Sequence, residues 1–488
     1  MNENNPGFRR NILSGSLFSV IARWTVRLIG LVNTMIIARL LTPADFGIAT
    51  MSVITVGLLT TLSELGVVNL VIRSQDRSEA FVRTGWTLQV LQGSVVGLLV
   101  VLGSPLAVRY FEEPRLEPVL YLAALTVFIA GFQSMGLALA RKDLNYRADF
   151  RFLVLTRVMN FVCVVSLAVW LRSYWALVAG ALLANTLTTL ASFWLFPWLP
   201  RFQLVHYRPF LNFALAAIPM SMARFAIDRV GAIVVGGVGS SAQLGIYHVS
   251  SDLSQMATAE VVDPIGRVLI PNYAKLVDQP EKLAQSFLYS IQLILTIALP
   301  AAVGLSAVAE DFVLTLLGDQ WQAAGDLVAW LALYFLASGV LQVLTTNILV
   351  AVGREHLASL LYWIRLAMLV PVMFYFGTYH GVMEMVMAAT VAMVLMLPAA
   401  LHITLRHLVL GGRQLLLGIS RPVLAVLCML AVLTLLPVVP PPGPLALLWQ
   451  VLVGALSYGG VLLLSWYLVG RPEGVEASVV EMLTQRLR

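Results

Sequence analysis

The chain is a succession of apolar runs, each about 20 residues long and bounded by Pro, Gly or charged residues. A run of this length is what an α-helix needs to cross the hydrocarbon core of a bilayer. Charged residues make up only 11% of the chain, whereas a soluble domain carries about 25%. Because so little charge cannot cover a water-exposed surface, we expect an all-α polytopic membrane protein. About fourteen transmembrane helices are predicted, near residues 14–36, 46–64, 84–104, 118–140, 150–171, 174–196, 210–234, 242–263, 284–306, 323–351, 356–377, 381–404, 419–437 and 445–469.

Lys and Arg fall unevenly on the loops between these predicted spans. With an even number of spans both termini lie on one side of the membrane, and about two thirds of the 31 Lys and Arg residues then lie on that side. Since cytoplasmic loops are enriched in Lys and Arg, we expect both termini to be cytoplasmic. This topology accounts for the net charge of +6, and no basic block or motif indicates a nucleic-acid partner.

Two segments about 200 residues apart resemble each other, as in transporters built from internal repeats. The segment IIARLLTPADFGIA at 36–49 corresponds to IVVGGVGSSAQLGIY at 233–247, and Gly47 aligns with Gly245. A second, weaker likeness links ALARKDLNY at 138–146 to LVAVGREHL at 349–357. We therefore expect two pseudo-symmetric six-helix bundles, residues 1–200 and 201–408. Two additional transmembrane helices and a short cytoplasmic tail follow in residues 409–488.

Arginine residues inside the predicted spans are the strongest functional signal. Each costs at least ~2.5–3.5 kcal/mol if it faces lipid. Arg23 and Arg27 lie one turn apart in the first span, and Arg224 and Arg229 lie in the seventh. Because guanidinium groups bind phosphate oxygens bidentately and stay charged when desolvated, we expect these four residues to line a cationic cavity for an anionic ligand such as a lipid diphosphate. The alternatives are that Arg224 forms a buried pair with Asp228, and that Arg27 snorkels to the interface.

Titratable residues accompany these arginines in the seventh and eighth spans. We expect Asp228, His248 and Asp252 to supply counter-charge to the arginines, or to couple transport to a proton or cation. Glu64 closes the second predicted span and is expected to be a gate or helix-end residue. Arg157 and Arg365 hold corresponding positions in the two halves, where snorkelling to the head groups is the favoured role and cavity lining the alternative.

Motifs of enzymes are missing from the sequence. There is no P-loop, no paired metal-ligand spacing and no nucleophile elbow. We therefore expect no enzyme activity, no metal site and no cofactor. The loops are short, which leaves no room for a soluble catalytic domain.

The N-terminal segments 14–54 and 62–73 resemble the opening of the bacterial polysaccharide and O-antigen export flippases. The pattern ARLLTPADFG at 38–47 and the ELG at 64–66 carry most of this likeness, and ALARKDLNYR at 138–147 adds to it. These flippases belong to the multidrug/oligosaccharidyl-lipid/polysaccharide (MOP) exporter superfamily. The resemblance implies two six-helix bundles in a V, alternating access, and a cationic central cavity that maps onto Arg23, Arg27 and Arg224.

The resemblance further implies the substrate and the location of the protein. We expect a flippase that moves undecaprenyl-diphosphate-linked oligosaccharide to the periplasmic leaflet of the bacterial inner membrane, for exopolysaccharide, capsule or lipopolysaccharide O-antigen. Its expected partners are this lipid-linked glycan and the lipid bilayer, with polysaccharide polymerase and chain-length proteins as further candidates. A drug/cation antiporter is the alternative, and it would require carboxylates to dominate the cavity. A membrane-bound polymerase or ligase would need a larger outer loop, and a scaffold would not need intramembrane arginines.

Overall fold

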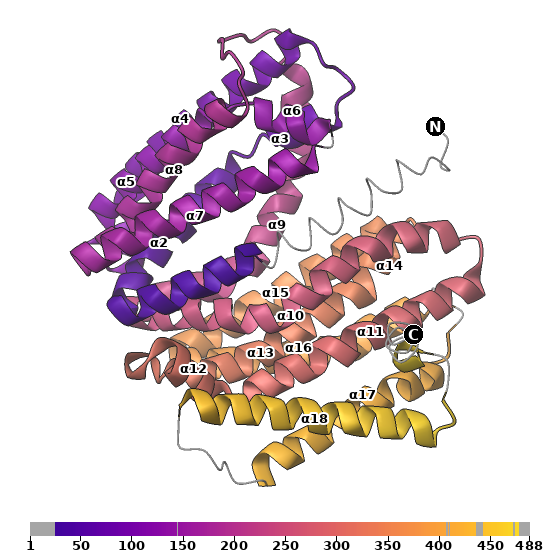
Figure 1. Ribbon diagram of the computed structural model, residues 1–488. Coiled ribbons are helices and arrows are strands. Elements are labelled where there is room, and N and C mark those ends of the chain that lie inside the picture. Colours follow the sequence, from indigo (N-terminus) through magenta and orange to yellow (C-terminus); the bar gives the residue numbers. More distant parts are fainter. Residues whose placement is uncertain are drawn as a thin grey trace. The chain divides into compact units, whose positions relative to one another are not determined.

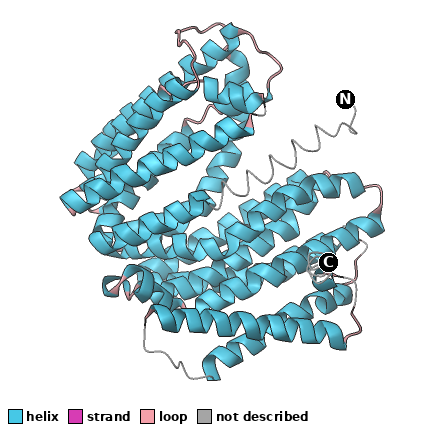
Figure 2. Cartoon of the chain, viewed as in Figure 1, coloured by secondary structure: helices cyan, strands magenta, loops and turns pink. Residues whose placement is uncertain are grey.

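The computed structural model describes residues 25–143, 145–406, 408, 410–435, 443–471 and 474–477. All regular secondary structure in these residues is helical (Figures 1 and 2). The chain forms two compact units, Met1–Gly245 and Ile246–Arg488. The predicted division into residues 1–200, 201–408 and 409–488 stays a prediction.

Ten described helices are long and apolar enough to cross a membrane, or up to 12 if each of two bent helix pairs is one span. The protein is therefore a multi-pass α-helical membrane protein, and the expected count of about fourteen is approximately supported. Residues 25–40 are helical, but most of the first expected span lies outside the described residues. The eighth expected span corresponds to α10 (Ser241–Leu276), a helix of 36 residues that is not among the ten.

The first unit is built from helices that approach one another through small residues. α4 packs against α5, α5 against α8, α7 against α8, and α2 against α9. Where α4 crosses α5, a Cβ on Gly93 would lie 3.0 Å from the carbonyl oxygen of Val127, so the backbones are close, as is common between membrane helices. The helices of this unit are α2 (Pro43–Leu62), α3 (Val67–Arg73), α4 (Glu79–Phe111), α5 (Leu116–Gly131), α6 (Gly136–Lys142), α7 (Tyr146–Leu171), α8 (Trp175–Leu195) and α9 (Arg208–Val238).

In the second unit, α13 packs against α11 and α16, and α15 against α16. The two C-terminal helices pack on α11, where the Tyr458 hydroxyl donates to the carbonyl oxygen of Thr296 at 2.8 Å. The elements are α11 (Pro280–Ala307), α12 (Ala309–Leu317), a 3₁₀ turn (Asp319–Trp321), α13 (Ala324–Gln342), a π-helical turn (Val343–Asn347), α14 (Ile348–Ala351), α15 (Glu355–Tyr379), α16 (Val382–Leu405), α17 (Gly412–Leu435) and α18 (Pro444–Leu468).

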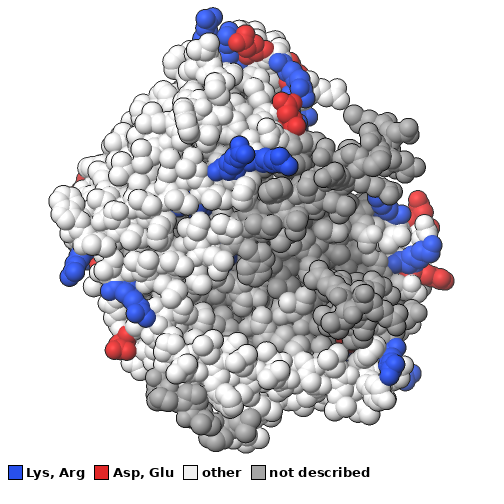
Figure 3. Space-filling view, viewed as in Figure 1, with Lys and Arg blue, Asp and Glu red and all other residues white. Residues whose placement is uncertain are grey.

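The surface has the composition expected for contact with lipid. On α4, Leu102 is 66% exposed and Leu106 is 73% exposed. On the face shown in Figure 3, charged side chains occupy scattered places separated by wide uncharged areas. Exposed leucines on this scale would be unfavourable in water and are favourable in a bilayer.

Candidate functional site

The repeated sequence motif forms a helix crossing in the first unit. α2 begins at Pro43 and α10 at Ser241, and their first turns lie against each other at Gly47 and Gly245. A Cβ on Gly47 would lie 1.7 Å from the carbonyl oxygen of Ser241, and one on Gly245 would lie 1.9 Å from that of Pro43. These distances are far shorter than van der Waals contact, so only glycine fits at either position. The two glycines that align in the sequence repeat are therefore in contact in space.

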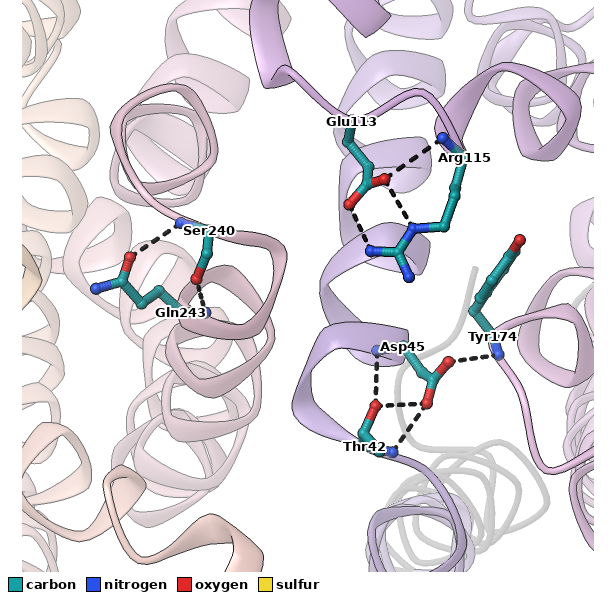
Figure 4. Close-up of polar contacts among 7 residues, drawn as sticks. All are labelled: Thr42, Asp45, Glu113, Arg115, Tyr174, Ser240 and Gln243. Carbon is teal, nitrogen blue, oxygen red and sulfur yellow. Dashed lines mark hydrogen bonds and ion pairs between the residues drawn. The ribbon is translucent and has the colours of Figure 1, made fainter.

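Each helix of the crossing begins with a capping box at the same place in the repeat (Figure 4). The N–H of Thr42 donates to Asp45 Oδ2 at 3.0 Å, and the N–H of Asp45 donates to the Thr42 hydroxyl at 3.4 Å. In α10, the N–H of Ser240 donates to Gln243 Oε1 at 2.9 Å, and the N–H of Gln243 donates to the Ser240 hydroxyl at 3.2 Å. The repeat in sequence is thus a repeat of local structure.

Polar residues from two more loops surround this crossing (Figure 4). Asp45 Oδ1 accepts the N–H of Tyr174 at 2.8 Å. Arg115 makes a bidentate ion pair with Glu113, with both N–O distances 2.8 Å. The Arg115 guanidinium holds the pKa of Glu113 below its usual range, and the Ser241 hydroxyl contributes to the same shift. We call Asp45, Glu113, Arg115, Ser240 and Gln243 the polar collar.

The collar joins loops that the topology prediction puts on one side of the membrane. The segments 37–45, 105–117, 172–174 and 235–241 meet at this end of the unit. At another end, Arg77 pairs with Asp143 at 3.0 Å, and Lys142 donates to the carbonyl oxygen of Asp76 at 2.8 Å. The helix α4 separates these two ends of the unit, while the side of the membrane on which each end lies stays a prediction. The collar was missed in the sequence, although T-x-x-D and S-x-x-Q before apolar runs are capping signals.

Two of the predicted site residues form an exposed ion pair on α9. Arg224 Nε lies 3.8 Å from Asp228 Oδ2, and the side chains are 79% and 62% exposed. The pair sits close to the middle of the helix, on a face that it shares with exposed Met220 at i,i+4 spacing. The neighbouring Phe225 instead contacts α2 at Gly57. The alternative of a buried pair is therefore wrong, because this face of α9 points away from the packed interior.

Arg27 and Arg224 lie at similar distances along their helices from the repeated motif. Counting back from the capping boxes, each stands about four helical turns, or about 23 Å, before the capping residue, Thr42 or Ser240. Arg27 is half-buried on the helix at 25–40, and Arg229 is half-buried on α9. Arg23 lies outside the described residues.

The remaining predicted residues lie at helix ends or in the second unit. Glu64 is half-buried and directly follows Ser63, the C-cap of α2. His248 and Asp252 lie on the part of α10 that belongs to the second unit, where His248 is half-buried and Asp252 is exposed. The structure thus brings Arg224 and Asp228 together in one unit, while the roles predicted for Glu64, His248 and Asp252 stay predictions.

The fold is that of membrane transporters of the MOP superfamily. The chain is similar to the lipid II flippase MurJ in an inward-closed conformation, with a TM-score of 0.75 and 14% identity over 93% of this chain and 99% of that one. It is also similar to an inward-facing multidrug resistance MATE family transporter of the MOP superfamily, with a TM-score of 0.59 and 14% identity over 80% and 98% of the two chains. At these identities the likeness establishes the fold alone.

Within that class, residues 36–326 match the family described as polysaccharide biosynthesis protein, which is more than half of the chain. The chain belongs to this family, and the resemblance seen in its sequence is confirmed.

Curated relatives carry names of the same kind. The chain is 26% identical over 326 residues to the lipopolysaccharide biosynthesis protein WzxC of Escherichia coli K12, covering 64% of this chain and 65% of that protein, slightly less than two thirds of its length. It is 20% identical over 369 residues to the teichuronic acid biosynthesis protein TuaB of Bacillus subtilis 168, covering 73% and 74%. It is 23% identical over 335 residues to the succinoglycan biosynthesis transport protein ExoT of Rhizobium meliloti 1021, covering 68% and 67%.

Proposed function

We propose that the protein is a flippase for undecaprenyl-diphosphate-linked oligosaccharide. It moves the glycan head group from the cytoplasmic to the periplasmic leaflet of the bacterial inner membrane, with both of its own termini in the cytoplasm. The exported glycan is a unit of exopolysaccharide, capsule or lipopolysaccharide O-antigen. The family supports a role in polysaccharide biosynthesis, and one observation carries the substrate class: the exposed Arg224–Asp228 pair at mid-length of a membrane helix.

The exposure of this pair favours an aqueous cavity. A guanidinium group facing lipid at mid-bilayer costs at least ~2.5–3.5 kcal/mol. Asp228 offsets part of this cost, but at a separation of 3.8 Å the Arg224 side chain is still 79% exposed, so its charge faces either lipid or water. A face of α9 that lines a wet cavity removes the cost. Arg224 and Arg27, at similar distances along their helices from the repeated motif, then offer two phosphate-binding groups from two helices.

A diphosphate suits these residues in charge and in energetics. Each arginine offers a planar fork to phosphate oxygens, and Asp228 orients the fork of Arg224. Moving a negative head group outward runs with an inside-negative membrane potential, which contributes about 2.3 kcal/mol per charge per 100 mV. Transport can therefore proceed with or without ion coupling through His248 and Asp252.

Alternating access would use α10 as the link between the two units. Its first residues, up to Gly245, are fixed to α2 by the glycine crossing, whereas the rest of the helix belongs to the second unit. Movement of the second unit therefore acts on the collar through α10. In this proposal the collar closes the periplasmic end while the head group enters from the cytoplasm.

The alternative function is a drug/cation antiporter, which the shared fold with a MATE transporter keeps open. Such a protein needs carboxylates to dominate its cavity. In the described part of α9 the charges at mid-span are two arginines and one aspartate, Arg224, Arg229 and Asp228. That balance favours an anionic ligand over a cationic drug.

Reconstitution into liposomes tests the proposal. A fluorescent undecaprenyl-diphosphate oligosaccharide is placed in both leaflets, and its accessibility to an external quencher is followed over time. Arg224→Gln and Arg27→Gln should each slow protein-dependent movement by about tenfold or more, since each removes charge-assisted hydrogen bonds. Arg77→Gln is the matched control, because Arg77 also pairs with an aspartate, Asp143, in an exposed position outside the membrane spans.

The outcomes separate the two functions. Unchanged movement in the Arg27→Gln/Arg224→Gln double variant would refute the anionic cavity. No movement of any lipid-linked glycan, together with drug export driven by a cation gradient, would establish the antiporter instead.

A further inference from the structure

Arg365 is a buried intramembrane arginine in the second unit. It lies on α15, about 15 Å along the helix from Glu355, and only 8% of its surface is exposed. Its Nη2 donates to the Ser338 hydroxyl of α13 at 2.6 Å, while its Nε has no hydrogen-bond partner among the described residues. Snorkelling to the head groups is therefore the wrong role for this residue. The structure shows Arg365 at a small cavity, while lining of a central transport cavity stays a prediction.

The cavity that Arg365 lines is small and polar on one side. Its volume is about 20 Å³, and Gln342, Thr345, Thr346 and Tyr362 line it together with Arg365 and three apolar residues. None of these lining residues is a carboxylate. Gln342 is exposed, so the cavity has a route to the surface.

A π-helical turn forms one wall of this cavity. The turn spans Val343–Asn347 at the end of α13, and it contains both threonines of the lining. Single π-turns are rare and occur frequently at functional sites, because the extra residue distorts the helix and survives only where it is useful. The Thr345 hydroxyl donates to the carbonyl oxygen of Leu341 at 2.8 Å. The hydroxyl of Thr346 and the amide of Gln342 are further groups able to donate toward the cavity.

Size and charge together identify the ligand. A cation buried without counter-charge is strongly unfavourable, so Arg365 requires either a neutral acceptor or an anion. The cavity has room for one water-sized body, so a monatomic anion suits it better than phosphate, sulfate or a carboxylate. A water molecule would accept from Nε but would leave the charge uncompensated. We infer that this cavity is a binding site for one monatomic anion, with chloride as the most abundant member of that class.

This site is independent of the proposed substrate. It is too small for a diphosphate, and it lies in the second unit, whereas Arg27 and Arg224 lie in the first. Loss of anion binding at Arg365 and loss of lipid binding at Arg224 are therefore separable by measurement.

Thermal unfolding of the purified full-length protein tests the inference. Sodium chloride is titrated against sodium gluconate at constant ionic strength, and Tm is read from tryptophan fluorescence. Chloride and bromide should raise Tm along a saturable curve, while sulfate and gluconate should not. Arg365→Met should lose the chloride response and, without chloride, should be at least as stable as the wild type, because it removes an uncompensated charge.

Two further variants complete the design. Arg354→Gln removes an exposed charge from the N-cap of the same helix and should keep the wild-type response. Thr346→Val keeps Arg365 and should weaken the apparent chloride affinity by about tenfold or more, since it removes a hydrogen bond to a charged ligand. It also decides the question if Arg365→Met does not fold.

Three results would overturn the anion site. The first is a wild-type Tm that does not respond to chloride, which means that the cavity holds water only. The second is sulfate acting as strongly as chloride, which is a general salt effect. The third is a chloride response that is unchanged in Thr346→Val and in any Arg365→Met protein that folds.

Discussion

Replacing either glycine of the α2–α10 crossing with alanine should destabilise the protein strongly. The added Cβ would lie 1.7 Å from a carbonyl oxygen at Gly47 and 1.9 Å at Gly245, whereas real Cβ contacts stay beyond 3.0 Å. The helices must therefore move apart by more than about 1 Å. Overpacking a core usually costs about 1–3 kcal/mol, and here backbone meets backbone, so we expect about 3 kcal/mol or more for each substitution.

The two substitutions should not be additive, and this is the sharper test. Once Gly47→Ala has spread the crossing, the space that Gly245→Ala needs is already partly open. A double-mutant cycle should show the double variant losing less free energy of unfolding than the two single variants combined, by about 1–3 kcal/mol. The measurement is equilibrium unfolding in mixed micelles.

Gly103→Ala on α4 is the control for helix propensity. A Cβ on Gly103 would meet nothing within 4 Å. Alanine should therefore stabilise this helix by about 0.5–1 kcal/mol. If Gly47→Ala behaves like Gly103→Ala, or if the two crossing substitutions add fully, the close crossing is not a feature of the folded protein.

Two other predictions concern ion pairs away from the proposed substrate site. Arg115 lowers the pKa of Glu113 from its usual value of about 4.5, so this pair should stabilise the fold above that pH. The stabilisation should be lost as the pH falls through the lowered pKa of Glu113. A plot of Tm against pH should show this loss in the wild type and not in Glu113→Gln. Arg421 and Glu476 pair at 3.1 Å with side chains 11% and 4% exposed. Glu476→Gln alone should lower the free energy of unfolding by about 3–5 kcal/mol, because it leaves the buried charge of Arg421 unpaired. The Arg421→Met/Glu476→Leu double variant should lower it by less. An equal loss of unfolding free energy in the two variants would contradict this prediction.

Local signals predicted the repeat and the membrane fold well. Apolar runs report directly on burial in lipid, so twelve of the expected spans match described helices or bent pairs. The aligned Gly47 and Gly245 proved to be in contact, because the motif around them specifies a cap and a close approach by chemistry that acts over a few residues. Such local signals can be read from the sequence because they do not depend on tertiary contacts.

The sequence did not predict which charged side chains are buried by tertiary packing. Arg157 and Arg365 hold corresponding positions, yet Arg365 is buried and bonded to Ser338 of another helix. It shares a cavity with residues of the π-turn at 343–347, and no residue pattern in that segment predicts the extra residue in the turn. The exposure of Arg224 is likewise set by which face of α9 packs on α2, through Phe225 and Gly57.

The helix α10 shows why low hydropathy need not mean that a segment lies outside the membrane. Its Ser250 and Ser254 hydroxyls donate to the carbonyl oxygens of Ala324 and Val328 on α13, at 3.4 and 3.0 Å. These polar groups are satisfied within the second unit and need no water. Asp252, between them, points to the opposite side and is exposed. One face of α10 is hydrogen-bonded to a neighbouring helix, and the other face carries a charge. Such a helix is unsuited to being surrounded by lipid, whereas it suits a position beside water. The serines that lower the hydropathy of α10 are therefore hydrogen-bonded within the second unit, and low hydropathy alone does not place this helix outside the membrane.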